Sequence, residues 1–201
     1  MRVKYLSPLI ALLLISLFSC ESKRPAPNTP IPLNQEEEVV FLEKGRFIAT
    51  TTFTALSGKL QEALQQGGVK QAISYCQQAA IPLTDSLSVA EGAEIRRTSL
   101  KVRNPQNAPT PTEKLILEDY AKNAKAGKEL KPIVRRNDKQ VIAFYAPIKV
   151  NTFCLQCHGK LGQTLKEEDY AIIKEHYPGD LALGYVDGDL RGMWSIQFTE
   201  K

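Results

Sequence analysis

Three residues in the last third of the chain combine types and spacing that can do chemistry. Residues 153–160 read Phe-Cys-Leu-Gln-Cys-His-Gly-Lys, so Cys154, Cys157 and His158 form a C-x-x-C-H motif. This is the pattern of c-type haem attachment, because two thiols at this spacing reach the two vinyl groups on one edge of a porphyrin and the adjacent imidazole can bind its iron. The motif predicts one haem c per chain, with Cys154 and Cys157 as thioether anchors and His158 as the proximal iron ligand.

Three other uses of these side chains stay open. The two cysteines could form a structural disulfide, which does not need His158. They could be a redox pair of the thioredoxin type, although such a pair is expected in a βαβ setting, which the flanking sequence does not show. A zinc ion could take both thiolates and the imidazole, but it would need a fourth ligand.

The ligand on the other side of the iron must come from a short list, because the chain has four Cys and two His. The candidates are His176, Met193, Cys76, a lysine, or no protein ligand. Cys76 falls on the apolar face of an expected helix, where ferric iron could stabilise a thiolate that bulk water cannot reach. A buried free Cys is also an ordinary small core residue, so the residues alone leave this ligand open.

The N-terminus has the features of an export signal. Residues 6–19 are almost entirely apolar, follow two basic residues and are too short for a typical transmembrane helix. The sequence Leu-Phe-Ser-Cys that ends at Cys20 resembles the lipobox of bacterial lipoproteins, in which the chain is cut before the Cys and lipid is attached to its sulfur. We therefore expect a signal peptide over residues 1–19, a lipidated, Pro-rich tether over 20–35, and a location in the bacterial cell envelope, lipid-anchored in the periplasm or at the outer membrane.

The composition predicts one ordinary folded domain over residues 36–201. The chain has 201 residues, of which 43% are hydrophobic and 24% charged, as in globular proteins. Its net charge of +4, from 26 Lys and Arg against 22 Asp and Glu, is small. No nucleic-acid partner is expected, since such proteins usually carry a clustered basic face.

Helices are expected early in the chain and antiparallel strands late, which predicts the α+β class. Gly67 and Gly68 are expected to separate the first two helices. The expected helices cover residues 35–66, 69–80, 112–126 and 164–176. The expected hairpin arms cover residues 132–136 with 140–150, and 182–186 with 190–199. Residues 82–111 are expected to be mostly irregular.

Five blocks of sequence, including the C-x-x-C-H motif, together resemble one family. The family is the bacterial haem c-binding domain with a PAS-like fold, long catalogued as a domain of unknown function. The resemblance covers most of residues 36–199 and keeps the order of the motifs. In chain order the blocks cover residues 72–76, 96–109, 154–159, 177–185 and 188–192.

The resemblance implies a PAS-like antiparallel sheet with N-terminal helices packed beside it, and haem c bound by a loop between a strand and a helix. It also implies that Cys76 is the distal iron ligand. The Arg-Asn-Pro segment would lie near the haem. Arg96, Arg97 and Arg103 are therefore candidates for contacts to the haem propionates, because a guanidinium fork matches a carboxylate.

We expect a mono-haem cytochrome that transfers electrons to or from a separate redox partner protein, since an iron with both axial positions filled needs no open site. The alternative is a haem-based redox or gas sensor, in which Cys76 leaves the iron and the sheet passes the change to a separate partner. An enzyme is not expected, because it would need an open iron position and a distal acid–base residue. We assign no catalytic residues.

Overall fold

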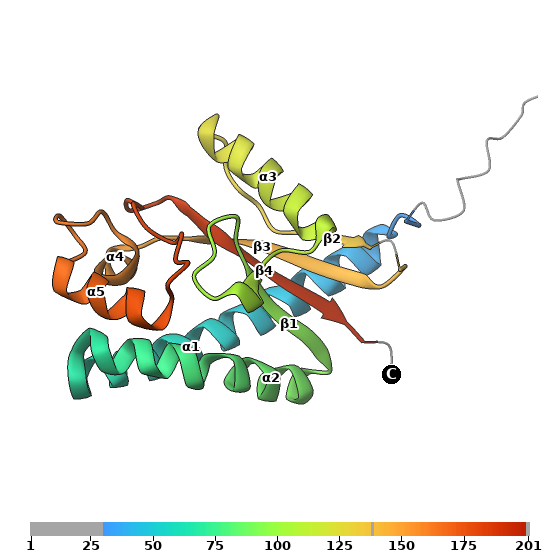
Figure 1. Ribbon diagram of the computed structural model, residues 1–201. Helices are drawn as coiled ribbons and strands as arrows, with labels where there is room; N and C mark the ends of the chain where they lie inside the picture. Colours follow the sequence, from blue (N-terminus) through green and yellow to red (C-terminus); the bar gives the residue numbers. More distant parts are fainter. Residues whose placement is uncertain (1–29, 138, 200–201) are drawn as a thin grey trace, which may run out of the picture.

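The fold is built on four antiparallel strands, β1 (Ala93–Thr98), β2 (Ile133–Arg136), β3 (Ile142–Lys149) and β4 (Leu190–Phe198). The computed structural model describes residues 30–137 and 139–199. The strand order across the sheet is β1-β4-β3-β2. Helices cover both faces of the sheet (Figure 1). The expected α+β class is therefore confirmed, as is an antiparallel sheet with N-terminal helices packed beside it.

The longest element is α1 (Gln35–Gln78), which begins at a capping box formed by Asn34 and Glu37. It is interrupted at Gly67 and Gly68, whose backbone angles are not helical; Gly68 has a φ of 62°. A positive φ of this kind favours glycine, since it lacks a Cβ. The predicted break is thus confirmed, and it gives residues 69–78 a direction of their own.

Residues 82–111 are more regular than expected, so that prediction is wrong in part. They contain most of α2 (Ala80–Glu91) and all of β1. Pro82 lies in the first turn of α2, where the missing N–H of a proline would have no helical partner, so the helix tolerates it. Gly92 ends α2 with a φ of 60° and leads directly into β1. Only residues 99–110 are irregular, around the short 3₁₀ helix η1 (Pro105–Asn107).

The hairpin β2–β3 and the helices α3 (Pro111–Lys125) and α5 (Glu167–His176) confirm three of the expected elements, although α5 begins three residues later than expected. The short elements η2 (Thr152–Cys154) and α4 (Leu155–His158) lie between β3 and α5.

The prediction of a closing hairpin is only half correct. Strand β4 forms, but residues 182–186 are not a strand. The backbone N–H groups of Gly184 and Tyr185 donate instead to the carbonyl oxygens of Gly159, at 2.9 Å, and His158, at 3.1 Å. Gly184 also has a φ of 77°, which an extended strand cannot hold. The segment therefore wraps the C-x-x-C-H turn rather than pairing with β4.

Alternating residues of β3 and β4 build two cores, one on each face of the sheet. On the α1 and α2 face the core includes Phe144, Trp194 and Ile196. On the α3 face it includes Met193 and Tyr145, which pack with Ile116, Leu117 and Tyr120 of α3.

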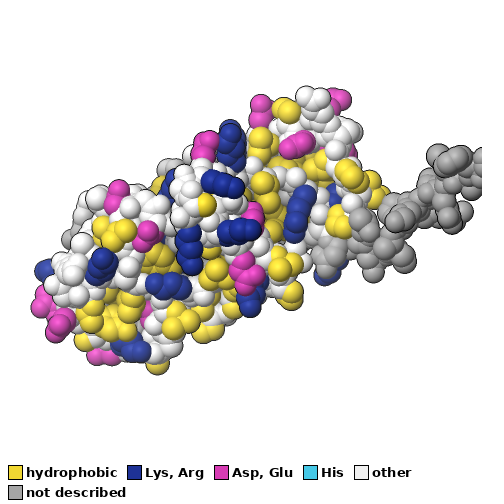
Figure 2. Space-filling view, turned by 90° about the horizontal axis from the view of Figure 1, so that it is seen from above, with side chains coloured by type: hydrophobic (Ala, Val, Ile, Leu, Met, Phe, Trp, Pro, Cys, Tyr) yellow, Lys and Arg dark blue, Asp and Glu magenta, His cyan; other side chains and the backbone are white. Residues whose placement is uncertain are grey.

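Basic, acidic and hydrophobic side chains are interspersed on the face of the molecule shown in Figure 2. No helix in the described part of the chain is both long and apolar enough to cross a membrane. The expected signal peptide, Cys20 and most of the tether lie outside the described residues.

Candidate functional site

A cavity of about 260 Å³ brings together residues that are far apart in the chain. It lies among α1, the start of α2, the end of β1 with the irregular segment after it, the end of β3, the C-x-x-C-H turn, Tyr177 and the start of β4. Helix α5 packs against α1 at the same end of the molecule (Figure 1). Most of the lining is apolar, and its chemically active members are Cys76, Cys154, Cys157, His158, Arg97, Arg103 and Arg191.

The C-x-x-C-H turn begins at a side-chain cap. The side-chain oxygen of Asn151 accepts hydrogen bonds from the backbone N–H of Cys154, at 3.2 Å, and from its thiol, at 3.1 Å. The chain then turns through η2 and α4, so that Cys154, Cys157 and His158 all reach the cavity. Burial raises the pKa of the Cys157 thiol to about 11, although the charge of Arg103 opposes this shift. Cys76, Cys154 and Cys157 are all free thiols.

The imidazole of His158 is held by its Nδ1 atom, which lies 2.8 Å from the carbonyl oxygen of Ala182. A carbonyl can only accept a hydrogen bond, so Nδ1 carries the proton and Nε2 keeps a free lone pair. Burial lowers the pKa of His158 well below its usual range, and the charges of Arg191 and Arg103 add to this effect. A neutral imidazole with a fixed Nδ1–H is the form in which His binds a metal through Nε2.

Cys76 lies on α1 beyond the Gly67–Gly68 break and lines the same cavity as His158. Burial raises the pKa of its thiol, while Arg97 and Arg103 lower it. The other candidates for the second iron ligand are placed elsewhere. His176 lies outside the cavity lining, with Nδ1 2.8 Å from the side-chain oxygen of Gln77. Met193 is fully buried in the core beneath α3.

The three arginines singled out from the sequence have three different environments. Arg97 lines the cavity and lies over the ring of Trp194, at 5.9 Å from its centroid. Arg103 also lines it but forms a buried ion pair with Asp180. Arg96 is not in the lining, because its side chain turns to Glu113, with Nε and Oε1 3.4 Å apart.

Sequence reasoning missed Arg191 as a residue of this site. It lines the cavity from the start of β4, donates to the carbonyl oxygen of Lys101 at 3.1 Å and lies over the ring of Tyr185. A charged residue beside Gly192, at the start of a strand of largely buried residues, was the available signal.

Two of the alternative uses of the motif, a zinc site and a thioredoxin-like redox pair, can be compared with the described part of the chain. No group of three or more His, Cys, Asp or Glu side chains there is placed to hold a metal ion. The motif follows β3 and precedes α5 in a sheet whose strand pairs are all antiparallel, so the βαβ setting typical of a thioredoxin-like pair is not found among these residues.

Comparison with known proteins gives one family and one similar solved structure. The family model described as Tll0287-like matches residues 34–199. The solved structure is that of the cyanobacterial heme-protein Tll0287, which is 24% identical in sequence and has a TM-score of 0.54. The match covers 84% of this chain and 98% of that chain, and it shows that the two share a fold. None of the curated proteins compared with the chain matches it.

Proposed function

Because this chain belongs to the Tll0287-like family, we propose that it is a c-type haem protein of the bacterial cell envelope that acts in electron transfer. The observation that carries the proposal is a single cavity lined by Cys154, Cys157, His158 and Cys76, in which the hydrogen bond of His158 Nδ1 leaves Nε2 free. The name of the similar protein agrees with a haem cofactor.

The residues present fit a haem. The cavity lining is mainly apolar, as the flat body of a porphyrin requires. The phenolic oxygen of Tyr75, also in the lining, is buried and has no hydrogen-bond partner in the described part of the chain. A buried polar atom of this kind is normally satisfied by a ligand or a water molecule.

Each side chain has a distinct role in this proposal. The thiols of Cys154 and Cys157 would form the two thioether links of a haem c, and His158 Nε2 and the thiolate of Cys76 would hold its iron. When bound, haem supplies one-electron redox chemistry. The guanidinium of Arg97 favours the thiolate form of Cys76, since it is among the charges that lower the pKa of this thiol.

Arg97 and Arg191 are the better candidates for contacts to the haem propionates. Both line the cavity, and in the described part of the chain neither has a carboxylate within ion-pair distance. Burial lowers the pKa of both guanidinium groups, so each gains from an anion brought by a ligand. Arg96 and Arg103 are already committed to Glu113 and Asp180.

The direction of the chain fits attachment to a membrane through lipid on Cys20. Helix α1 starts at Gln35, and the first cavity residue on it is Phe53. Eighteen helical residues span about 27 Å, and α1 begins at the opposite end of the molecule from α4 and α5 (Figure 1). The tether would therefore join the domain well away from the haem cavity. This arrangement leaves the cavity end free to meet a redox partner protein.

One feature supports the alternative of a redox or gas sensor. Gly67 and Gly68 interrupt α1 nine and eight residues before Cys76, so the segment that carries this ligand is joined to the rest of the helix by a bend. A ligand on such a segment can leave the iron with little strain elsewhere, and a sensor needs such a two-state element.

The experiment is haem analysis of the protein exported with a haem-attachment system. Intact mass and a pyridine haemochrome spectrum should show one covalent haem per chain, and a haem-free product would overturn the proposal. Carbon monoxide and nitric oxide should then be added to the reduced protein. Inertness supports electron transfer, whereas fast binding with loss of a protein ligand supports sensing.

A further inference from the structure

A buried ion pair lies directly behind the C-x-x-C-H turn. Arg103 Nη2 and Asp180 Oδ2 are 2.9 Å apart, and the two side chains are 8% and 0% exposed. Each charge needs the other, because removing one partner of a buried pair leaves an uncompensated charge in a low-dielectric environment. The pair joins the irregular segment after β1 to the segment that wraps the turn.

Both members of the pair also hold the backbone around His158. Arg103 Nη2 donates to the carbonyl oxygen of Cys157, at 2.6 Å, and more weakly to that of Ala182, at 3.4 Å. Asp180 Oδ1 accepts from the backbone N–H of Ala182, at 2.9 Å. The carbonyl oxygen of Ala182 in turn accepts the Nδ1 proton of His158, at 2.8 Å.

Ala182 therefore links the ion pair to the imidazole: its N–H is held by Asp180, and its carbonyl oxygen holds His158 Nδ1. The tautomer of His158 follows from a carbonyl that can only accept, and the ring orientation follows from where that carbonyl lies. Arg103 also fixes the residue just before His158, through the carbonyl oxygen of Cys157. The imidazole is thus held by two routes that meet at one guanidinium group.

We infer that Arg103 and Asp180 are positioning residues, which set the orientation and tautomer of His158 through Ala182 and Cys157. This inference rests on the proposed function, in which His158 binds the haem iron. It gives the Arg-Asn-Pro segment a task other than contact with the propionates. It also explains why residues 182–186 fold around the turn instead of forming a strand.

The test compares Arg103→Gln, Arg103→Lys and Asp180→Asn in the haem-loaded protein, with Glu113→Gln as the matched control. Glu113 belongs to another Arg–carboxylate pair, formed with Arg96, in which the carboxylate is buried and which lies outside the cavity lining. The readouts are the electron paramagnetic resonance spectrum of the ferric protein, the reduction potential and hydrogen exchange at the amides of Ala182 and Tyr185.

Arg103→Gln and Asp180→Asn both break the ion pair that holds the Ala182 segment. Both should therefore move the ferric g-values in the same direction and speed exchange at the Ala182 amide by about tenfold. Arg103→Lys keeps the charge without the planar fork, so it should restore thermal stability but not the wild-type spectrum. Glu113→Gln should lower stability and leave the spectrum unchanged. If Arg103→Gln does not accumulate, the other two ion-pair variants, Arg103→Lys and Asp180→Asn, provide the test.

A purely electrostatic role predicts a different pattern. Loss of a positive and of a negative charge would then shift the reduction potential in opposite directions with unchanged g-values, and this result would overturn the inference. So would a loss of stability alone in all three variants. A wild-type protein without covalent haem would overturn the proposed function and this inference together, whereas spectra that do not change in haem-loaded variants would overturn only the inference.

Discussion

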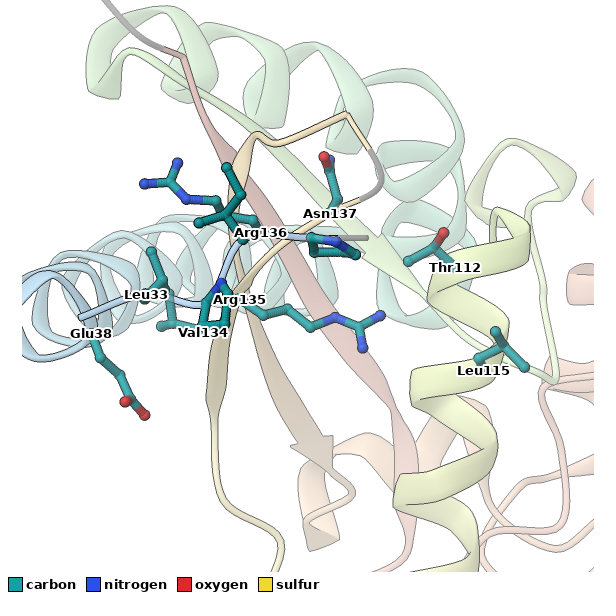
Figure 3. Close-up of a pocket in the computed structure, with 11 residues that line it drawn as sticks. Leu33, Glu38, Thr112, Leu115, Val134, Arg135, Arg136 and Asn137 are labelled. Atoms are coloured by element: carbon teal, nitrogen blue, oxygen red, sulfur yellow. The ribbon is translucent and has the colours of Figure 1, made fainter. Parts of the chain in front are cut away.

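Two pockets in the described part of the chain differ in size and in the side chains that line them. The haem cavity of the proposal has a volume of about 260 Å³, whereas a second pocket measures about 520 Å³. This N-terminal pocket is lined by residues 30–33, Glu38 of α1, the start of α3 and residues 134–137, which belong to β2 and its end (Figure 3). Its lining contains no Cys or His.

The arginines of the two pockets also differ in their partners. In the N-terminal pocket Arg136 is paired with Glu37, with 3.0 Å between Nη2 and Oε1, near the capping box of α1. In the haem cavity Arg97 has a thiol and aromatic rings around it instead of a carboxylate. Volume alone therefore does not identify a site. The candidate site is marked instead by partly buried thiols, a fixed imidazole and buried cations that have no carboxylate partner among the described residues.

The largest effect is expected from Cys154→Ser combined with Cys157→Ser. This change removes both thioether links, so no haem should stay attached under denaturing conditions, as measured by intact mass. The matched control is Leu115→Ala in the N-terminal pocket, where the side chain is 66% exposed. This control should keep the wild-type haem content. A similar loss of haem in both proteins would refute the assignment of the two cysteines as the attachment points.

The next effect is a change of the iron's second ligand. Cys76→Ala should alter the ferric absorption spectrum and raise the reduction potential by roughly 100 mV or more, since axial ligands set haem potentials over about 0.8 V and an anionic sulfur stabilises ferric iron. Spectroelectrochemistry measures both quantities. His176→Ala should change neither, because its side chain faces Gln77. The opposite pattern in these two variants would refute the assignment of Cys76.

A smaller effect concerns the wall of the cavity at high pH. Burial raises the pKa of Tyr177 from the ordinary value of 10.0 to about 12. The unfolded chain therefore loses this proton first, and the free energy of unfolding should fall as the pH rises from about 10 to about 12. Urea titrations across this range measure the effect. Tyr177→Phe should flatten the dependence, and an equally steep decline in this variant would contradict the assignment.

The smallest effect is expected in the N-terminal pocket. Arg136→Gln breaks the ion pair with Glu37, whose side chains are 19% and 34% exposed. Partly exposed pairs contribute little, so the free energy of unfolding should fall by about 0.5–1 kcal/mol. The ferric spectrum should stay the same. Any change in it would mean that a substitution in the N-terminal pocket affects the haem cavity.

Local signals in the sequence predict most of the fold and the centre of the site. The C-x-x-C-H motif, the break at Gly67–Gly68 and the β2–β3 hairpin each depend on residues that are neighbours in the chain. The sequence does not show that residues 182–186 prefer the C-x-x-C-H turn to β4, because that choice depends on hydrogen bonds between distant segments. Sequence reasoning also missed α2, because Pro82 in its first turn indicates the start of an irregular segment.

The arginines show the same limit at the level of single side chains. Arg96 and Arg97 are adjacent on β1, so their side chains leave opposite faces of the sheet, and only Arg97 reaches the cavity. Because the two residues are of the same type and adjacent, the sequence does not show which of them faces the cavity. The pairing of Arg103 with Asp180 spans 77 positions and depends on the complete fold.

The proposed function depends most on His158 and Cys76 as the two side chains that would hold the iron of one haem. X-ray absorption at the iron edge of the ferric wild-type protein tests it most directly, because sulfur and nitrogen ligands scatter at different distances. We expect one sulfur ligand together with nitrogen ligands, and loss of the sulfur contribution in Cys76→Ala. An iron site with nitrogen and oxygen ligands alone in the wild-type protein would contradict it.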